Sequence, residues 1–419
     1  MTAEKYDLIV YGASGFVGKI LVGYLANTYG FGGDKLHWAI AGRSSKKLEE
    51  VKREVIKFAS SASATLPTFI ADAGDANALR CMCEQTGVVV STVGPYSLYG
   101  ETLVRVCAET GTDYCDLTGE AHWLLQMICK YQQQAQKTGA RIVNCCGFDS
   151  IPSDLGVYFT QQNAQQNLGQ PCDTIHMRVA KLKGTFSGGT YASMLNSIKE
   201  LGANARLKKA LGSPYCLCPS DHSFKTRQIS TNEVSHDSLT DSWLTPFVMA
   251  GINTRIVHRS NSLLGELYGE NFKYDEALVA GKGPEGRKRA SKLSFTLKAL
   301  LFAASISPLR WLLSRFLLPS PGQGPSKKQQ DNGAFLFIFE GNINNKGTIK
   351  CSVSGDSDPG YGATAQMLGE AAVFLALKVS KTDLPGGFWT PASIFKDKLI
   401  NVLHKNTGIC FKVDKINRK

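Results

Sequence analysis

The sequence predicts an α/β protein: an N-terminal Rossmann-type domain on a doubly wound parallel sheet, then a second α/β domain with a partly antiparallel sheet. Three observations predict it. A glycine-rich turn, YGASGFVG at residues 11–18, follows an apolar run and precedes a helical pattern. Strand-like and helix-like patterns then alternate to about residue 156. The chain has 419 residues, too many for one ordinary core, and its pattern changes to paired strands after about residue 170.

The first strand and helix flank a turn suited to a dinucleotide. KYDLIVYG has the pattern of a buried parallel strand, and FVGKILVGYLAN has helical spacing. Glycines at the three turn positions would allow a tight turn, close approach of a pyrophosphate and packing of the helix on the sheet. The helix N-terminus offers N–H groups to phosphate. The predicted cofactor loop comprises Gly12, Ser14, Gly15, Phe16 and Gly18, although a tight turn without a ligand would show the same spacing.

The end of the second strand indicates which dinucleotide binds. An NAD site would place Asp or Glu after LHWAIAG, to accept hydrogen bonds from the ribose hydroxyls. This chain instead has Arg43 and Ser44, with Lys47 shortly after. These groups suit a 2′-phosphate, so the sequence predicts NADP(H). The alternative is that the cations belong to a solvated helix start.

Two further strand ends complete the predicted cofactor site. TFIADAGDANAL has the pattern of a third strand that ends at Asp72, whose side chain could reach the adenine. VVVSTVGPY predicts a fourth strand, which Gly94 and Pro95 interrupt. Ligands of doubly wound sheets lie at the carboxyl ends of the strands. We therefore expect Gly94 and Pro95 to border the nicotinamide ribose.

Motifs along nearly the whole chain resemble the saccharopine dehydrogenase-like oxidoreductases. They are GASGFVG, AGRS, VGPYSLYGE, YCDLTGE, GFDSIPSDLG, DPGYGATAQM and GGFWTPA. The chain is most similar to the branch with the trans-acting enoyl reductases of bacterial envelope glycolipid synthesis and the animal lipid-droplet proteins. The resemblance implies an NADP-binding domain at 1–156, a second domain at 157–358, and a C-terminal helix and tail at 359–419 that return to the first domain. It does not imply saccharopine as substrate, because the basic residues are not grouped where a dicarboxylated amino acid would need them.

Three side chains are candidates for the chemistry of an enoyl reduction, in which a hydride and a proton reach neighbouring carbons. Tyr96 follows a strand end and could donate to a developing enolate oxygen, or could only pack against the nicotinamide. Glu120 is a general-acid candidate, unless it starts a helix capped by Thr118 and faces solvent. Tyr191, in GTFSGGTYASML, could face the nicotinamide. Asp149 lies in the turn GFDSIPSDLG at the domain junction, where it could cap a helix or line the cleft.

A basic apolar segment at 282–318 contains most of the excess positive charge. The chain has a formal charge of +12, and Lys282–Lys328 contains ten Lys or Arg and one acid. Its apolar run of 11 residues, Ala299–Leu309, is short of the roughly 20 that span a bilayer. The segment predicts attachment to an anionic membrane surface, with a cytoplasmic protein on the inner face of the plasma membrane or on a lipid droplet. A buried helix or a homodimer contact is the alternative.

The remaining composition argues against several other classes. The twelve cysteines contain no C-x-x-C spacing, so we expect no metal site and reduced thiols. No secretory signal opens the sequence, no nucleophile elbow indicates a hydrolase, and basic residues interleaved with Leu and Phe do not suit a nucleic acid. The prediction is an NADPH-dependent reductase of a double bond in a lipid or acyl substrate. The alternatives are an amino-acid-derivative dehydrogenase and a nucleotide-binding scaffold without turnover.

Overall fold

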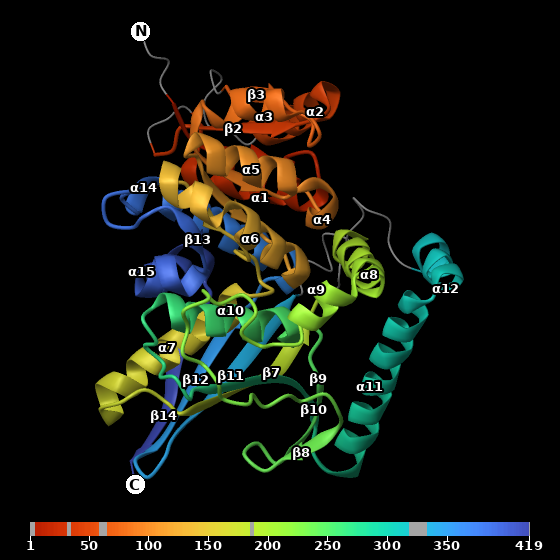
Figure 1. The fold of residues 1–419 in the computed structure, drawn as a ribbon, viewed down its shortest axis with the longest axis vertical. Coiled ribbons are helices and arrows are strands. Elements are labelled where there is room, and N and C mark those ends of the chain that lie inside the picture. Colours follow the sequence, from red (N-terminus) through yellow and green to blue (C-terminus); the bar gives the residue numbers. More distant parts are fainter. Residues whose placement is uncertain (1–4, 32–34, 58–64, 185–187, 318–332, 419) are drawn as a thin grey trace.

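The structure is a computed structural model that describes residues 5–31, 35–57, 65–184, 188–317 and 333–418. Its strands form two sheets, one in the upper and one in the lower half of Figure 1. The predicted fold class, two α/β domains with one parallel and one partly antiparallel sheet, is confirmed.

The first sheet is parallel and has seven strands in the order β13-β6-β5-β4-β1-β2-β3. Its strands are β1 Tyr6–Tyr11, β2 Trp38–Gly42, β3 Thr68–Ile70, β4 Thr86–Ser91, β5 Asp113–Asp116, β6 Arg141–Val143 and β13 Gly387–Trp389. The helices of this part are α1 Phe16–Tyr29, α2 Ser45–Ile56, α3 Ala76–Cys83, α4 Tyr96–Tyr99, α5 Glu101–Thr110 and α6 Ala121–Thr138. The next helix, α7 Ile151–Leu168, packs against the second sheet. Apolar side chains of β1 are fully buried because helices cover both faces of the sheet.

The second sheet is mixed, with the order β14-β12-β11-β7-β10-β9-β8. Its strands are β7 Thr174–Lys183, β8 Ser235–Asp237, β9 Ser242–Pro246, β10 Lys273–Gly281, β11 Ala334–Ile343, β12 Gly347–Gly355 and β14 Cys410–Arg418. β7 and β10 are parallel, and the other pairs are antiparallel. β11 and β12 form an antiparallel pair, in agreement with the paired strands expected after about residue 170.

The remaining helices belong to the second domain and the C-terminal region. They are α8 Gly188–Ala203, α9 Ala205–Ala210, α10 Ala250–Leu263, α11 Gly283–Ser305, α12 Ser307–Leu312, α14 Thr364–Lys378 and α15 Pro391–Thr407, with the short π-helical turns η1 Leu313–Leu317 and η2 Pro359–Ala363.

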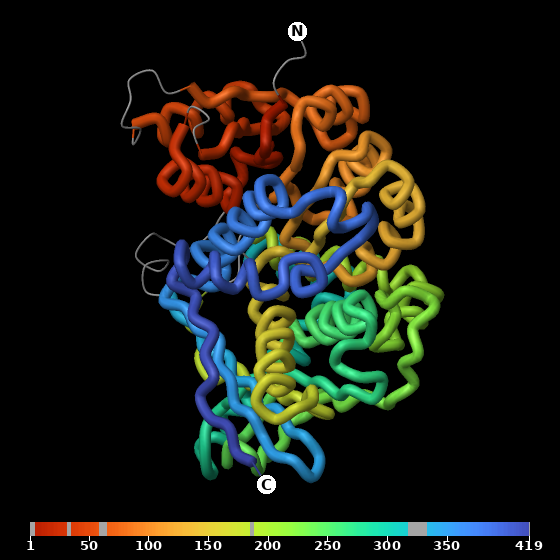
Figure 2. The backbone as a smooth tube through the Cα atoms, turned by 90° about the vertical axis from the view of Figure 1, so that its left-hand side faces the viewer, coloured from red at the N-terminus to blue at the C-terminus, as the bar shows by residue number. Residues whose placement is uncertain are grey.

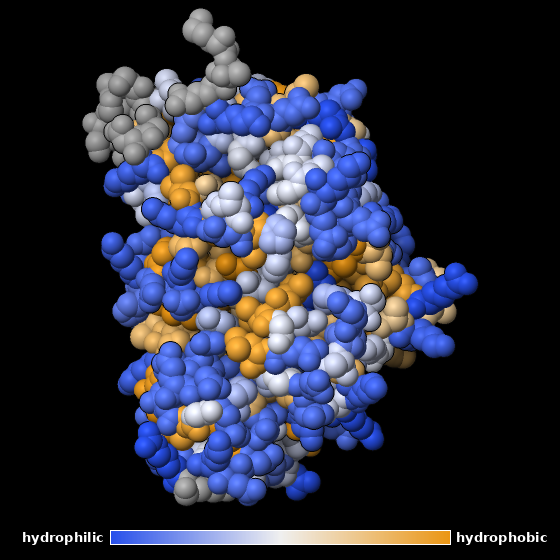
Figure 3. Space-filling view, turned by 60° about the vertical axis from the view of Figure 1, so that its left-hand side comes forward, coloured by the Kyte–Doolittle hydropathy of each residue, from blue (hydrophilic) through white to orange (hydrophobic). Residues whose placement is uncertain are grey.

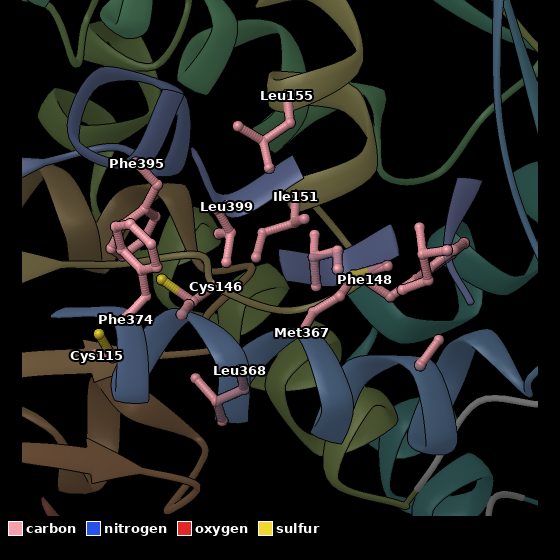
Figure 4. Close-up of a cluster of buried hydrophobic side chains, with 14 of the residues drawn as sticks. Cys115, Cys146, Phe148, Ile151, Leu155, Met367, Leu368, Phe374, Phe395 and Leu399 are labelled. Atoms are coloured by element: carbon pink, nitrogen blue, oxygen red, sulfur yellow. The ribbon is translucent and has the colours of Figure 1, made fainter. Parts of the chain in front are cut away.

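The C-terminal helices lie between the two sheets. In Figure 2 the blue C-terminal part of the chain runs between the upper and lower halves and then down to the C-terminus. Figure 4 shows the contact, where Met367 and Phe374 of α14 and Phe395 of α15 pack near Cys146 and Ile151. On the face in Figure 3, hydrophobic side chains form a band across the middle between two mostly hydrophilic ends. One large core of buried side chains joins both domains, since it contains Leu8 of β1 and Phe337 of β11.

The C-terminal segment contributes to both domains. β13 extends the first sheet beside β6, and α14 packs on α1, β1, β4 and β5. The final strand, β14, pairs with β12 in the second sheet. The tail of the predicted segment 359–419 therefore ends on the second domain, whereas the preceding helix and β13 return to the first. Residue 156, the predicted end of the first domain, lies within α7.

The basic apolar segment forms an arm of α11, α12 and η1. α11 and α12 lie at the right of Figure 1, where α11 packs against β9, β10 and α8, and their axes are bent by 107° at the break between them. The part of the chain that the structure describes contains no single helix long and apolar enough to cross a membrane, whereas this bent pair passes that test by length and composition. In the predicted segment 282–318, Leu318 is outside the described residues, as are Lys327 and Lys328 beyond it.

Candidate functional site

The glycine turn after β1 has the geometry of a phosphate-binding loop. Gly12 has a φ of +88°, and a Cβ there would lie 2.6 Å from Val93 Cγ2. A Cβ on Gly18 would lie 2.2 Å from the carbonyl oxygen of Gly12, so only glycine lets α1 start this close to the strand. Gly15 is exposed at the start of α1, which has no side-chain cap and no acid in its first turn. Uncapped N–H groups and the positive end of the helix dipole suit a phosphate.

Two further predicted loop residues flank this turn. Ser14 is partly buried, with its Oγ 3.8 Å from where a Cβ on Gly42 would lie. The ring of Phe16 packs edge-on against Tyr361 of η2, with ring centroids 4.8 Å apart. The C-terminal motif DPGYGATAQM thus lies beside the cofactor turn, a contact between residues that are hundreds of positions apart in the sequence.

The end of β2 presents free positive charge beside the turn. The side chains of Arg43 and Lys47 are exposed, and Arg43 has no ion pair or hydrogen bond within the described ranges. Ser44 caps α2, because its Oγ accepts a hydrogen bond of 3.4 Å from the backbone N–H of Lys47. The Ser44 hydroxyl hydrogen is still available to a ligand oxygen. The site therefore fits the 2′-phosphate of NADP(H).

Asp72 lies just past the third strand and not at its end. β3 ends at Ile70, two residues earlier. Asp72 is exposed, and its Oδ1 accepts a hydrogen bond of 2.9 Å from the backbone N–H of Gly74. One oxygen thus holds the turn and the other faces solvent. The predicted contact with the adenine remains a prediction.

Tyr96 is the first residue of α4, and its side chain is buried directly after the loop that follows β4. Gly94 is exposed, whereas Pro95 and Tyr96 are buried. The Tyr96 hydroxyl donates to the carbonyl oxygen of Ser91 at 3.0 Å and accepts from the N–H of Leu117 at 3.4 Å. Burial raises the pKa of Tyr96 well above its usual value, so the hydroxyl stays protonated. These contacts tie the ends of β4 and β5 together, and the predicted catalytic role stays a prediction.

Glu120 is fully engaged with the helix that follows the same loop. Its Oε1 accepts a hydrogen bond from the N–H of Tyr96 at 2.8 Å. Its Oε2 accepts from the N–H of Ser97 at 3.0 Å and from the Ser97 hydroxyl at 2.6 Å. The side chain is buried, so the solvent-facing alternative does not describe it. These three hydrogen bonds show that Glu120 fixes the loop at Gly94. The predicted role of Glu120 as a general acid stays a prediction.

Helix α8 of the second domain reaches the same loop. Asn196 donates to the Ser97 hydroxyl at 2.8 Å, and a Cβ on Gly94 would lie 3.8 Å from Ser193 Oγ. Glu200 of this helix lies 3.1 Å from Nε2 of the buried His122. Tyr191 is partly buried in the first turn of α8, and its place beside the nicotinamide stays a prediction. Residues 185–187 of the motif GTFSGGTYASML are outside the described part of the chain.

Asp149 is a functional candidate that the sequence placed only at the domain junction. It follows β6 at the ligand-binding edge, and its Oδ2 lies 3.6 Å from where a Cβ on Gly119 would be. The cap position of α7 is Ser150, which makes no side-chain cap bond, so Asp149 does not cap this helix. Burial raises the pKa of Asp149 to about 6. In the sequence, the signal that could have identified Asp149 as a site residue is its position after a strand of the parallel sheet.

A second carboxylate of the motif GFDSIPSDLG, that of Asp154, bonds to helices of the second domain and the C-terminal region. Asp154 accepts hydrogen bonds from the Ser260 hydroxyl at 2.6 Å and from the N–H of Ala392 at 2.8 Å. Burial raises its pKa to about 7. Asp154 belongs to GFDSIPSDLG and Ala392 to GGFWTPA, so these two motifs meet at the start of α15. The Asp154 carboxylate therefore joins the two motifs at the domain junction.

A cavity of about 760 Å³ lies in the second domain close to this junction. It is bordered by the loop 212–232, by the first turns of α10, and by residues 274–276 of β10. Phe247 and Ala250 line it, and the chain between them includes Met249, whose Cε lies 3.4 Å from where a Cβ on Gly119 would be. The cavity thus offers space for a substrate within the second domain. Within the described residues, no group of three or more His, Cys, Asp or Glu could hold a metal ion.

Comparisons with known proteins agree with this site. Residues 8–143 match the saccharopine dehydrogenase NADP binding domain family. A Mycobacterium tuberculosis protein named "Putative trans-acting enoyl reductase Rv2449c" is 36% identical over 412 residues, which cover 96% of each chain. The trans-acting enoyl reductase of Mycobacterium bovis is 32% identical, covering 95% of each chain, and that of Mycobacterium leprae is 30% identical, covering 96% of each.

A solved structure supports the fold alone. The saccharopine dehydrogenase (L-Glu forming) of Saccharomyces cerevisiae aligns with a TM-score of 0.52 at 14% identity, covering 98% of this chain and 100% of that one. Fold and cofactor edge together define a two-domain NADP-dependent oxidoreductase. The chain belongs to the saccharopine dehydrogenase-like family, together with the trans-acting enoyl reductases. The predicted family, enzyme class and cofactor are confirmed.

Proposed function

We propose that this oxidoreductase reduces a carbon–carbon double bond conjugated to the carbonyl of an acyl or lipid substrate. The observation that carries the proposal is the similarity to relatives named trans-acting enoyl reductases, which extends over 96% of both chains and so includes the second domain. The cavity in the second domain, bordered by Phe247 and Tyr274, supports a substrate held by that domain.

Each part of the site has a role in this reaction. NADPH bound here supplies the hydride. The turn at Gly12 and the N-terminus of α1 would hold the pyrophosphate, and Arg43 with Ser44 would hold the 2′-phosphate. Glu120 fixes the loop at Gly94, where the nicotinamide ribose would lie. Helix α8 covers this loop from the second domain and restricts access of water.

NADPH oxidation with a series of enoyl thioesters tests the proposal. We expect saturated thioesters in a 1:1 ratio with NADP⁺, at rates that depend on chain length. Saccharopine with NADP⁺, and its amino-acid and keto-acid precursors with NADPH, serve as the comparison for an amino-acid dehydrogenase. Turnover with the latter set alone would contradict the proposal. NADPH binding without turnover of any enoyl substrate would favour a nucleotide-binding scaffold.

We also propose that the arm of α11, α12 and η1 attaches the enzyme to an anionic membrane surface. The support is its exposed apolar side chains, among which Phe295 is 75% exposed, Phe302 66%, Trp311 62% and Phe316 68%. The arm also has many cations and, among the described residues, a single acid, Glu285. Aromatic side chains beside cations are typical of helices that lie in a lipid interface, where each cation contributes about 1 kcal/mol. An acyl substrate could then enter from the lipid.

Flotation with liposomes tests this attachment. We expect the enzyme to float with liposomes of phosphatidylserine and phosphatidylcholine, and less with phosphatidylcholine alone or at high salt. Replacing Phe295, Phe302, Trp311 and Phe316 by Ser should abolish flotation, while the matched replacement of the exposed Ile70 and Leu239 should not. Flotation of the arm variant would contradict the proposal. A wild-type dimer that the arm variant converts to a monomer, without flotation of either, would identify the arm as a dimer contact.

A further inference from the structure

Four loops meet at one point of the ligand-binding edge. Glu120 connects two of them, because its carboxylate accepts from the N–H of Tyr96, which follows Gly94 and Pro95. The residue before it, Gly119, is exposed. A Cβ added to Gly119 would lie 3.6 Å from Asp149 Oδ2 and 3.4 Å from Met249 Cε. The loops after β4, β5, β6 and β9 thus surround the place where the nicotinamide would approach a substrate in the second domain.

Asp149 differs from the buried acids near this edge in having no partner among the residues that the structure describes. Asp116 accepts hydrogen bonds from Thr118, Cys145, Asn144 and Tyr114. Asp154 and Glu276 likewise accept from neighbouring side chains or backbone. Asp149 makes no hydrogen bond or ion pair with any residue that the structure describes, and it is partly exposed. A carboxyl group that is partly buried but not used by the fold is available to a ligand.

The residues on either side of Asp149 hold it in place. The backbone N–H of Phe148 donates to the Thr364 hydroxyl at 3.2 Å, and the Phe148 ring packs on Phe335 of β11 at 4.8 Å. The Ser150 hydroxyl donates to Asn253 of α10 at 3.0 Å. The loop is therefore fixed to both domains, and its free carboxyl group is directed by rigid neighbours. Precise positioning of an acid is what proton transfer to a substrate requires.

We propose that Asp149 is the proton donor of the reduction, an inference that rests on the proposed enoyl reductase function. One carbon of the double bond receives the hydride that NADPH supplies. The electron pair of the π bond moves to the other carbon. There it forms a new C–H bond with the proton of the Asp149 carboxyl group, whose O–H bond breaks. The Asp149 carboxylate that remains regains a proton from water through the partly exposed edge. Tyr96 and Glu120 then act as positioning residues, which hold the loop at Gly94.

The electrostatic surroundings agree with this role. Burial raises the pKa of Asp149 to about 6, so a useful fraction of the group is protonated near neutral pH. The facing groups from the loops after β5 and β9, Gly119 and Met249, carry no charge. On its own loop the titratable neighbour is Cys145, whose pKa burial and nearby acids raise well above its usual value, so this thiol stays neutral. The reaction should slow as pH rises through about 6, because the acid form is lost.

A nitroalkene separates proton donation from every other role of Asp149. Addition of hydride to a nitroalkene gives a nitronate, which leaves the enzyme without needing an acid and absorbs in the near ultraviolet. We expect D149N to lower kcat with an enoyl thioester by about 100-fold or more, and to oxidise NADPH with the nitroalkene within about threefold of wild type. Nitronate should accumulate with D149N and not with wild type. D149E should restore part of the thioester activity.

The ratio of the two rates in one sample does not depend on how much protein is folded. D154N is the matched control, since Asp154 is a buried acid held by Ser260 and Ala392. It should lower the melting temperature and leave the ratio unchanged. A second readout needs no turnover: the Asp149 carboxyl carbon, followed by NMR in the free protein, should titrate near pH 6. Equal loss of both rates in D149N, or no loss, would overturn the proposal. Absence of thioester turnover in wild type would instead contradict the proposed function.

Discussion

Arg43 should decide which dinucleotide this enzyme prefers. Its guanidinium is exposed after β2 and has no partner among the described residues, so binding does not first break an ion pair. A charge-assisted hydrogen bond contributes about 1.5–3 kcal/mol. Arg43→Ala should therefore weaken NADPH binding by roughly 10- to 150-fold, nearer the lower value because water competes at an exposed site. NADH lacks the phosphate, and its affinity should change by less than about threefold.

Paired titrations that follow nicotinamide fluorescence measure this preference. Arg43→Glu should weaken NADPH binding further than Arg43→Ala, since a carboxylate would face the phosphate. Arg53→Ala is the matched control, because it removes an exposed arginine from the last turn of α2, the helix that begins two residues after Arg43. Equal weakening of NADPH and NADH by Arg43→Ala, or no change in either, would refute the assignment of Arg43 to the 2′-phosphate.

Three further predictions concern the same edge and its supports. Gly18→Ala should abolish NADPH binding, because the added Cβ would lie 2.2 Å from the backbone oxygen of Gly12. Gly23→Ala on the same helix is the control, since its Cβ would have no atom within 4 Å, and this variant should bind NADPH normally. Equal NADPH affinities of the two variants would contradict this prediction. Glu120→Gln should lower the melting temperature by several degrees, since one of three accepted hydrogen bonds is lost, and an unchanged melting temperature with kcat reduced 100-fold would instead make Glu120 catalytic. Burial raises the pKa of Asp154 to about 7, so the folded state binds an extra proton between about pH 4 and 7, and stability should fall by up to about 1.4 kcal/mol as pH rises through 7. Thermal unfolding at pH 6 and 8 should show this loss in wild type and a smaller one in Asp154→Asn, and a loss of equal size in both would refute it.

Local signals explain what the sequence could predict. The glycine spacing at residues 12–18 and the cations after β2 lie within short segments, so their roles at a strand end follow from the parallel sheet alone. The hairpin of β11 and β12 was likewise predictable from alternation and an Asn-rich turn. Such features need no knowledge of distant contacts.

The features that the sequence did not reveal depend on residues far apart in the chain. Glu120 bonds Tyr96 across 24 positions, and Asp154 bonds Ala392 across 238. Strand position alone could not tell that the Tyr96 hydroxyl would be buried between two strand ends. Nor could it tell that β14 would join the second sheet, since a C-terminal strand pairs with whichever edge the fold leaves open. Asp149 became distinct from its neighbours only when their partners were known.

The position of transferred hydride tests the central claim of an enoyl reduction most directly. The enzyme is supplied with NADPH deuterated at C4 and an enoyl thioester in ordinary water, and the saturated product is analysed by mass spectrometry and NMR. We expect one deuterium at the β-carbon and one proton from water at the α-carbon, with one NADP⁺ for each product. Deuterium at a carbonyl carbon, or bound NADPH that transfers no deuterium to any enoyl thioester, would contradict the claim.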